Sequence, residues 1–295
     1  MEEKLLREKI RNLVSESIDE VVEDIKEWNT SLEEAKGVSY EVENEVKNIV
    51  SDLQNYVNSF NIDYSKNNFQ IKHLEAIHEV FGVKINFKIN FYFFKNNDVY
   101  VQNEGNTTKL YKYVPSSKTV YISVYVVGKR IVKNTFNSKI AHEIRHAHQY
   151  KKTGKSNTEL LHPVKYYQIV KDIQKEGFPQ IIAHIKYLSS KYEQEAYSEE
   201  LYNELMYSDE PPEAYFRKTN PYLAYNMLKT CVKVLGTNKN NQELIEALSK
   251  WGYNYDDFLR KAHYAQQSFI KRLSRVLVQV QEDKIDTNPQ FNYKK

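Results

Sequence analysis

The sequence predicts an α+β fold that is mostly helical and contains one small antiparallel sheet. Three features support this prediction. Alternating β-branched and aromatic residues recur through 83–127, and clusters of Asn, Gly, Pro and Ser interrupt them at intervals that suit turns. Before residue 60, and again from about residue 134 almost to the end, apolar residues recur at three- and four-residue spacing. The sheet therefore precedes a helix that we expect over about 135–151.

The region before the sheet is predicted to be helical. Amphipathic patterns cover 2–28 and about 42–60, with a break near Gly37 between them, so together they resemble a helical hairpin. A third helix is predicted over 68–80, ending at Gly82. Two interpretations of the hairpin stay open: it binds a partner or inhibits the protein, or it simply packs on the rest of the fold.

The expected strands and the later helices follow in order. The strands are 83–94, 99–103, 109–114 and 118–127. After the helix of 135–151, one long helix is predicted over about 180–207 and an amphipathic basic helix over 269–284. The organisation that results begins with an acidic helical N-terminal region (1–65) and a core that combines the sheet with the next helices (66–210). A helical C-terminal region (211–285) and a disordered tail (286–295) follow.

Charge is distributed unevenly along the chain. The first 60 residues carry 7 Lys/Arg and 15 Asp/Glu, a net charge of −8, whereas the whole chain carries +3, so the remainder carries +11. The acidic N-terminal helices are therefore expected to bind either a partner or the protein's own basic surface. For the basic helix of 269–284, a solvated face is a simpler interpretation than a nucleic-acid site.

Composition excludes several classes of protein. No apolar run approaches the ~20 residues of a membrane-spanning helix, and the N-terminus lacks an apolar signal region. A single cysteine, Cys231, excludes an intrachain disulfide framework and cysteine-rich zinc modules. Neither a glycine-rich phosphate loop nor a G-x-S-x-G motif is present. We therefore expect a cytoplasmic protein without disulfides.

One motif carries recognisable chemistry. The expected helix of 135–151 contains H-E-x-x-H as His142, Glu143 and His146. Four residues turn a helix by about 400°, so the two imidazoles lie one turn apart on one face, a separation that suits two ligands of one tetrahedral zinc ion. Glu143 is rotated by about 100° from them. From that position it is expected to act as general base on an activated water.

Zinc needs a third protein ligand, and the sequence suggests where it lies. Gln149 and Lys152 occupy the positions where metzincins carry glycine and histidine, so that class is excluded. A glutamate within KYEQEAYSEELYNEL, at 191–205, would complete a His₂Glu site. With HEIRHAHQ, this E-x-E-A segment resembles the gluzincin clan of zinc metallopeptidases, in the compact form that bacterial and phage genomes encode. The resemblance covers roughly 118–207.

The resemblance implies a role for three positions on the later helix. Glu193 becomes the third zinc ligand, and Ala196 the position that lets two helices approach. At Tyr197 relatives often carry Asp or Asn, which supports the first histidine, so this sequence departs from the pattern. The apolar stripe of the predicted 180–207 helix instead favours Glu195 as the buried carboxylate.

Other candidates for the third ligand stay open as well; they are His162, His184 and Asp172. His148 lies on another face of the helix from His146 and is expected to be exposed or to support a ligand. His73 and His78 are expected to be structural, because no second histidine follows them at the required spacing. No tyrosine can be selected as a stabiliser of the transition state.

The resulting hypothesis is a zinc-dependent endopeptidase with ligands His142, His146 and Glu193 and with Glu143 as general base. A peptide is expected to bind by strand addition along 118–127. Two alternatives stay open: an interaction protein that retains a relic motif, and a zinc hydrolase that acts on a non-peptide substrate.

Overall fold

The computed structural model describes residues 40–103, 107, 111–114, 117–153, 169 and 171–287, within a compact unit that spans Gly37–Lys295. The predicted helix of 2–28 and the last residues of the tail lie outside this part. The described elements, in chain order, are α2 (Tyr40–Ser59), β1 (Phe69–Val80), β2 (Val83–Phe94), α3 (Asn97–Asn103), β3 (Tyr111–Val114), β4 (Thr119–Val127), β5 (Arg130–Ile131), α4 (Lys133–Thr153), α7 (Phe178–Leu188), α8 (Lys191–Met206), α9 (Pro212–Phe216), α10 (Asn220–Thr237), α11 (Gln242–Lys250) and α12 (Tyr255–Thr287).

The α+β class is confirmed, but the sheet is mixed rather than antiparallel. Its strand order is β1-β2-β4-β3, and the short β5 pairs with β4. β1 and β2 form an antiparallel hairpin through Phe81 and Gly82, whose φ angles of 53° and 73° suit a two-residue turn. β2 and β4 run parallel. The chain between them holds α3 and β3 and is long enough for the crossover that parallel neighbours need.

Two elements differ in type from the prediction. Residues 69–80, expected as a helix, form strand β1, which pairs with β2 along its whole length. This long pairing outweighs the helix-like spacing of its apolar residues. The expected strand 99–103 is part of helix α3. The Asn96 side chain accepts a hydrogen bond from the Val99 N–H at 3.1 Å, which caps the start of that helix.

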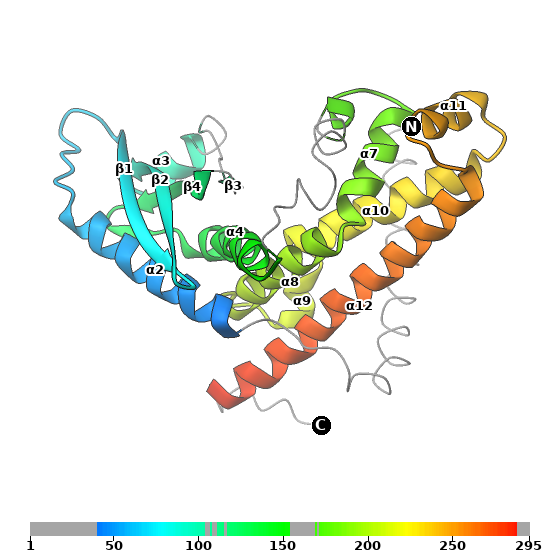
Figure 1. Cartoon of the computed structure of the whole chain (residues 1–295). Coiled ribbons are helices and arrows are strands. Elements are labelled where there is room, and N and C mark those ends of the chain that lie inside the picture. The colour runs from blue at the N-terminus through cyan, green and yellow to red at the C-terminus, as the bar shows by residue number, and fades with distance from the viewer. Residues whose placement is uncertain are drawn as a thin grey trace, which may run out of the picture. The chain divides into compact units, whose positions relative to one another are not determined.

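Helices α2 and α4 cover one face of the sheet (Figure 1). The expected second helix is thus confirmed as α2, and its apolar stripe joins the main core. This core combines α2 with the inward-facing residues of β2 and β4 and with the sheet-facing residues of α4, among them Val46, Leu53, Phe87, Phe91, Ile122, Val124, Ile140 and Ile144. One face of α4 is therefore held against the sheet by apolar burial.

The other side of α4 packs against α8, which lies in a helical region with α7, α10 and α12 (Figure 1). The single helix expected over 180–207 is two helices, because the chain leaves helical geometry at Ser190, whose ψ angle is 125°. The buried Gln194 side chain donates to the Leu188 and Ala265 carbonyl oxygens and so ties this junction to α12. α4 is therefore the element shared by the sheet and the helical region.

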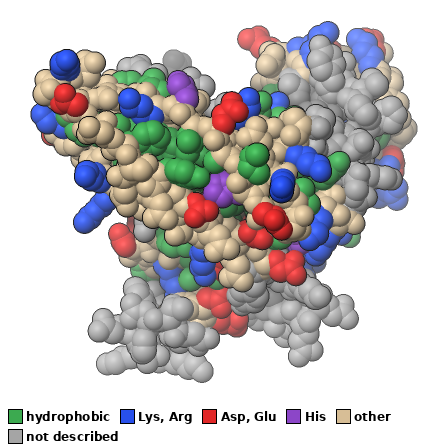
Figure 2. All heavy atoms as spheres, turned by 60° about the vertical axis from the view of Figure 1, so that its left-hand side comes forward, with side chains coloured by type: hydrophobic (Ala, Val, Ile, Leu, Met, Phe, Trp, Pro, Cys, Tyr) green, Lys and Arg blue, Asp and Glu red, His purple; other side chains and the backbone are tan. Residues whose placement is uncertain are grey.

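The surface is mixed in character. On the face shown in Figure 2, hydrophobic side chains gather in a patch beside a histidine, and charged side chains of both signs surround them. None of the described helices combines the length and the apolar character that crossing a bilayer requires.

Candidate metal centre

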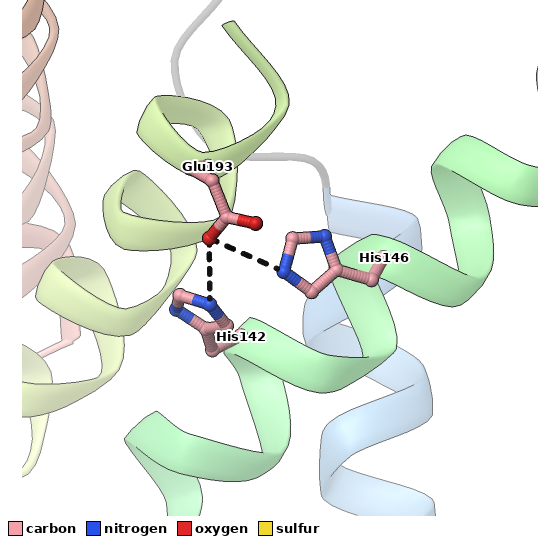
Figure 3. A group of neighbouring side chains, drawn as sticks. All are labelled: His142, His146 and Glu193. Atoms are coloured by element: carbon pink, nitrogen blue, oxygen red, sulfur yellow. Dashed lines mark ion pairs between the residues drawn. The ribbon is translucent and has the colours of Figure 1, made fainter. Parts of the chain in front are cut away.

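The two histidines of the motif project from α4 toward α8. Ile140 and Ile144 of α4 are buried in the core against the sheet. His142 and His146 lie on another face of the same helix, which is directed away from the sheet. Figure 3 shows both imidazoles converging on Glu193, which α8 contributes from its first turn. The i, i+4 spacing and the packing of α4 on α8 thus bring three candidate ligands together.

The three side chains are close enough to share one metal ion. The Nε2 atoms of His142 and His146 lie 3.6 and 3.7 Å from the same oxygen, Oε2 of Glu193. Ligand atoms of a tetrahedral zinc ion with bonds of about 2.0–2.1 Å lie about 3.4 Å apart. His142 and Glu193 are buried, and His146 is partly buried. Among the described residues, this is the one group of three such side chains that fits a metal ion.

Glu193, rather than Glu195, faces the histidines because α8 begins anew at Lys191. The apolar stripe of α7 does not continue in register across Ser189 and Ser190, so the stripe that favoured Glu195 is not one helical face. Ala196, at the expected close-packing position, is fully buried. Of the other candidates, His184 and Asp172 lie outside the group, and His162 lies outside the described residues.

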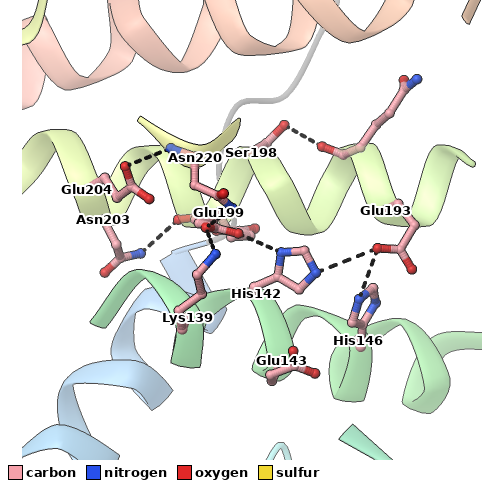
Figure 4. A network of polar contacts seen from close by, with 12 residues as sticks. Lys139, His142, Glu143, His146, Glu193, Ser198, Glu199, Asn203, Glu204 and Asn220 are labelled. Carbon is pink, nitrogen blue, oxygen red and sulfur yellow. Dashed lines mark hydrogen bonds and ion pairs between the residues drawn. The ribbon is translucent and has the colours of Figure 1, made fainter. Parts of the chain in front are cut away.

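His142 is oriented by a carboxylate that sequence reasoning did not identify. Its Nδ1 donates to Oε2 of Glu200 at 2.9 Å. Its Nε2 faces Glu193 on the other side of the ring (Figure 4). Glu200 is fully buried and also accepts from Lys139 and, at 2.9 Å, from Asn220. A carboxylate behind a ligand histidine fixes its tautomer and ring orientation. Glu200 is therefore the described carboxylate that orients the His142 ring, a role that the sequence resemblance had placed at position 197.

Tyr197 contacts the same imidazole through its ring. The ring centroids of Tyr197 and His142 lie 4.9 Å apart at an interplanar angle of 80°, an edge-to-face contact. The signal that could have identified Glu200 is its position seven residues after Glu193, which places both carboxylates on one face of a helix.

The charges of this group are strongly coupled. Burial lowers the pKa of His142, but hydrogen bonds to Glu193 and Glu200 outweigh it and raise this pKa to about 10. Burial raises the pKa of Glu193, yet the charges and hydrogen bonds of the two histidines hold it far below its ordinary value. The two carboxylates therefore favour positive charge at this place.

His146 has a different kind of support. Its Nδ1 donates to the amide oxygen of Gln149 at 3.0 Å. The Gln149 amide nitrogen in turn donates to the Tyr192 carbonyl oxygen and to Oε2 of Glu195, both at 3.0 Å. Arg145 pairs with the same Glu195 oxygen at 2.9 Å. Glu195 thus helps to position His146 through Gln149. It does not face His142, His146 and Glu193, which together form the candidate metal group.

Glu143 is placed beside the ligands and against the sheet. Its Oε2 accepts the backbone N–H of Tyr113 in β3 at 2.6 Å, and its side chain lies on a different side of α4 from the two imidazoles (Figure 4). A carboxylate has two oxygens, so this hydrogen bond orients Glu143 and leaves Oε1 able to accept a proton. Among the described strands, β3 forms the sheet edge next to this residue.

The expectation that 118–127 is a free edge for substrate is wrong. β4 pairs with β2 on one side and with β3 and β5 on the other, because the chain returns through α3 and β3. β3 is the edge strand that lies near the metal group instead.

Comparison with protein families, with curated proteins and with solved structures finds no match for the chain. The resemblance to the gluzincin clan therefore depends on the motif and on its immediate surroundings alone.

The remaining histidines of the prediction lie outside the group of His142, His146 and Glu193. His148 is buried rather than exposed and pairs with Glu41 of α2 at 3.1 Å. His73 and His78 both belong to β1, where His73 contacts Asn90 and His78 contacts Asp52.

Taken together, the side chains form a site with two imidazoles, one carboxylate and a second carboxylate close by. This donor set fits zinc, which prefers nitrogen and oxygen ligands in tetrahedral sites with a position left for water. Each imidazole uses Nδ1 for a protein partner and directs Nε2 inward. The arrangement can therefore hold one divalent ion, and Glu143 follows His142 on the same helix.

Proposed function

We propose that this chain is a zinc-dependent peptidase in which His142, His146 and Glu193 bind the metal and Glu143 is the general base. The observation that carries the proposal is the convergence of both Nε2 atoms on one Glu193 oxygen, with each Nδ1 held by a separate partner. A pair of histidines that happened to lie on a helix surface would not require this double support.

The residues divide the chemistry between them. When bound, zinc polarises a carbonyl group and makes a water molecule more acidic. Glu143 takes the proton of the attacking water and passes it to the leaving amine. Its hydrogen bond to the Tyr113 N–H fixes the carboxylate next to the ligand helix.

A peptide substrate is favoured by the strand next to the general base. β3 is at the edge of the sheet among the described strands, and the N–H of Tyr113 is already engaged by Glu143, so a peptide would pair with other backbone groups of this edge. An extended peptide can pair with backbone groups at such an edge. The substrate backbone would then lie beside Glu143 and the metal ligands.

The test combines metal content with peptidase activity. Wild-type protein purified without chelators is expected to hold one zinc ion per chain by elemental analysis and to cleave a denatured protein such as casein. His142→Ala should lose both properties, whereas Glu143→Gln should keep the zinc and lose the cleavage. His73→Ala is the matched control, because this histidine lies on the exposed side of β1. Metal-free wild-type protein that still cleaves casein would overturn the proposal.

A second function is favoured by one observation. The short hydrogen bond from the Tyr113 N–H gives Glu143 a structural role, since it satisfies a backbone group of an edge strand. In an interaction protein that binds zinc without catalysis, this role would be sufficient. That function predicts zinc in the wild type, no hydrolysis of peptides or esters, and a loss of stability in Glu143→Ala. Hydrolysis of esters without cleavage of any protein would instead indicate a non-peptide substrate.

A further inference from the structure

A cavity lies where the junction of α7 and α8 meets α12, apart from the side chains that face the metal group. Its volume is about 700 Å³, within the range of pockets that hold small ligands. Cationic side chains from both helices line it, namely Lys191, Arg260, Lys261 and Arg272. None of the described lining residues is acidic. A cavity with this lining favours an anion.

The acidic neighbours leave part of this positive charge uncompensated. Asp257 pairs with Arg260 and Lys261, each at 2.7 Å, on the exposed side of α12. Among the described residues, the ion pairs of Lys191 and Arg272 are with Glu195, at 3.9 and 4.0 Å, and that carboxylate is already engaged at 2.9 Å by Arg145. Long contacts to a shared carboxylate stabilise two cations weakly.

Two hydrogen-bond donors at the cavity also lack an acceptor among the described residues. Within the described part of the chain, Nε of Arg272 and Oγ of Ser189 are buried without a hydrogen-bond partner. The cavity also borders the start of α8, where the side chain of the N-cap Ser190 does not cap the helix. Unsatisfied buried donors are costly, and helix N-termini attract anions. Both features favour an oxyanion over a neutral ligand.

We propose that this cavity is a binding site for a phosphate group. Arginine donates to phosphate oxygens in pairs, and four cations suit a group with a charge near −2. Tyr264 lines the same cavity and is 75% exposed, so its ring is available to stack on the base of a nucleotide. Inorganic phosphate and a nucleotide both present a phosphate group. Only the nucleotide has a base that would contact Tyr264, so this residue distinguishes the two ligands.

Calorimetric titration tests the site with inorganic phosphate and with adenosine monophosphate, at constant ionic strength. Both probes are expected to bind once per chain. Arg272→Gln and the double variant Arg260→Gln/Lys261→Gln should each weaken binding about tenfold or more, because each removes a charge-assisted hydrogen bond. The double variant changes only exposed side chains and keeps the site testable if Arg272→Gln does not fold. Lys233→Gln, which removes one charge as Arg272→Gln does but at an exposed position of α10, should bind like the wild type.

The outcomes separate the two sources and the two proposals. Tighter binding of the nucleotide that is lost in Tyr264→Ala assigns a nucleotide, and equal binding of both probes assigns free phosphate. Failure of both probes to bind saturably, or unchanged binding in both cavity variants, overturns the inference. Zinc content is measured in the same samples, so failure here is distinguishable from failure of the metal site.

Discussion

The two histidines of the metal group are held by partners of different kinds. His142 donates to Glu200, a buried carboxylate that also pairs with Lys139. His146 donates to Gln149, an uncharged amide on the same helix. Removing one member of a buried ionic network leaves other charges without compensation. Removing the Gln149 amide breaks three hydrogen bonds but leaves the Glu195 carboxylate paired with Arg145. The comparison teaches that support for His142 depends on buried charge, whereas support for His146 depends on hydrogen bonds of an uncharged side chain.

Glu200→Ala should have the largest effect, since it removes the buried carboxylate that supports His142. It leaves Lys139 and the His142 Nδ1 without their acceptor in a buried setting. We expect the free energy of unfolding to fall by about 3–5 kcal/mol. Zinc affinity should fall by about 10–100-fold. Urea denaturation and competition with a chromogenic chelator measure the two effects.

Glu200→Gln is the matched control, because it keeps the size and an acceptor for His142. It should retain more stability and more zinc affinity than Glu200→Ala. Unchanged zinc affinity in both variants would show that Glu200 does not support the ligand.

Glu204→Gln tests the same network through pH. Burial and the charge of Glu200 raise the pKa of Glu204 to about 8, from an ordinary value of 4.5. The folded state therefore holds this proton more tightly than the unfolded chain, so stability falls as pH rises from the lower value to the higher one. Glu204→Gln should raise the free energy of unfolding by on the order of 1–2 kcal/mol at pH 9 and change it little at pH 5. Equal gains at both pH values would contradict this origin.

Gln149→Ala removes the uncharged side chain that supports His146. The variant removes the acceptor for His146 Nδ1 and the two hydrogen bonds that the Gln149 amide donates to α8, and should cost about 2 kcal/mol of stability. Zinc affinity should fall by about tenfold, the lower end of the range for residues that orient ligands. The comparison predicts a smaller loss of stability than for Glu200→Ala, measured by the same denaturation. A larger loss of stability than in Glu200→Ala would contradict the conclusion that the charged support of His142 matters more for folding.

Tyr197→Phe should have the smallest effect. It keeps the edge-to-face contact with the His142 ring and removes only a hydroxyl group. Stability and zinc affinity should change by less than about 0.5 kcal/mol. Loss of zinc in this variant would show that the Tyr197 hydroxyl supports His142, a role that the hydrogen bond at Nδ1 gives to Glu200.

The sequence was sufficient for the parts of the site that depend on local geometry. His142 and His146 follow from helical spacing, which tertiary structure does not alter. Glu193 needed the resemblance as well, because the register of α8 depends on the break at Ser190. Glu200 was missed because its contact with His142 spans 58 residues and becomes visible only when α4 packs on α8.

The errors in the fold have the same physical origin. β1 was predicted as a helix because its local apolar spacing suits one, yet pairing with β2 over twelve residues decides its structure. The parallel pairing of β2 with β4 depends on how the intervening chain crosses over, and no local pattern encodes that. The helices α2 and α4 were predictable because their amphipathic stripes are local.

The most direct measurement of the central hypothesis is an anomalous difference map at the zinc absorption edge, from crystals grown with zinc. A single strong peak is expected between Nε2 of His142, Nε2 of His146 and the carboxylate of Glu193. A peak at any other place, or zinc bound without Glu193, would contradict the proposed metal centre.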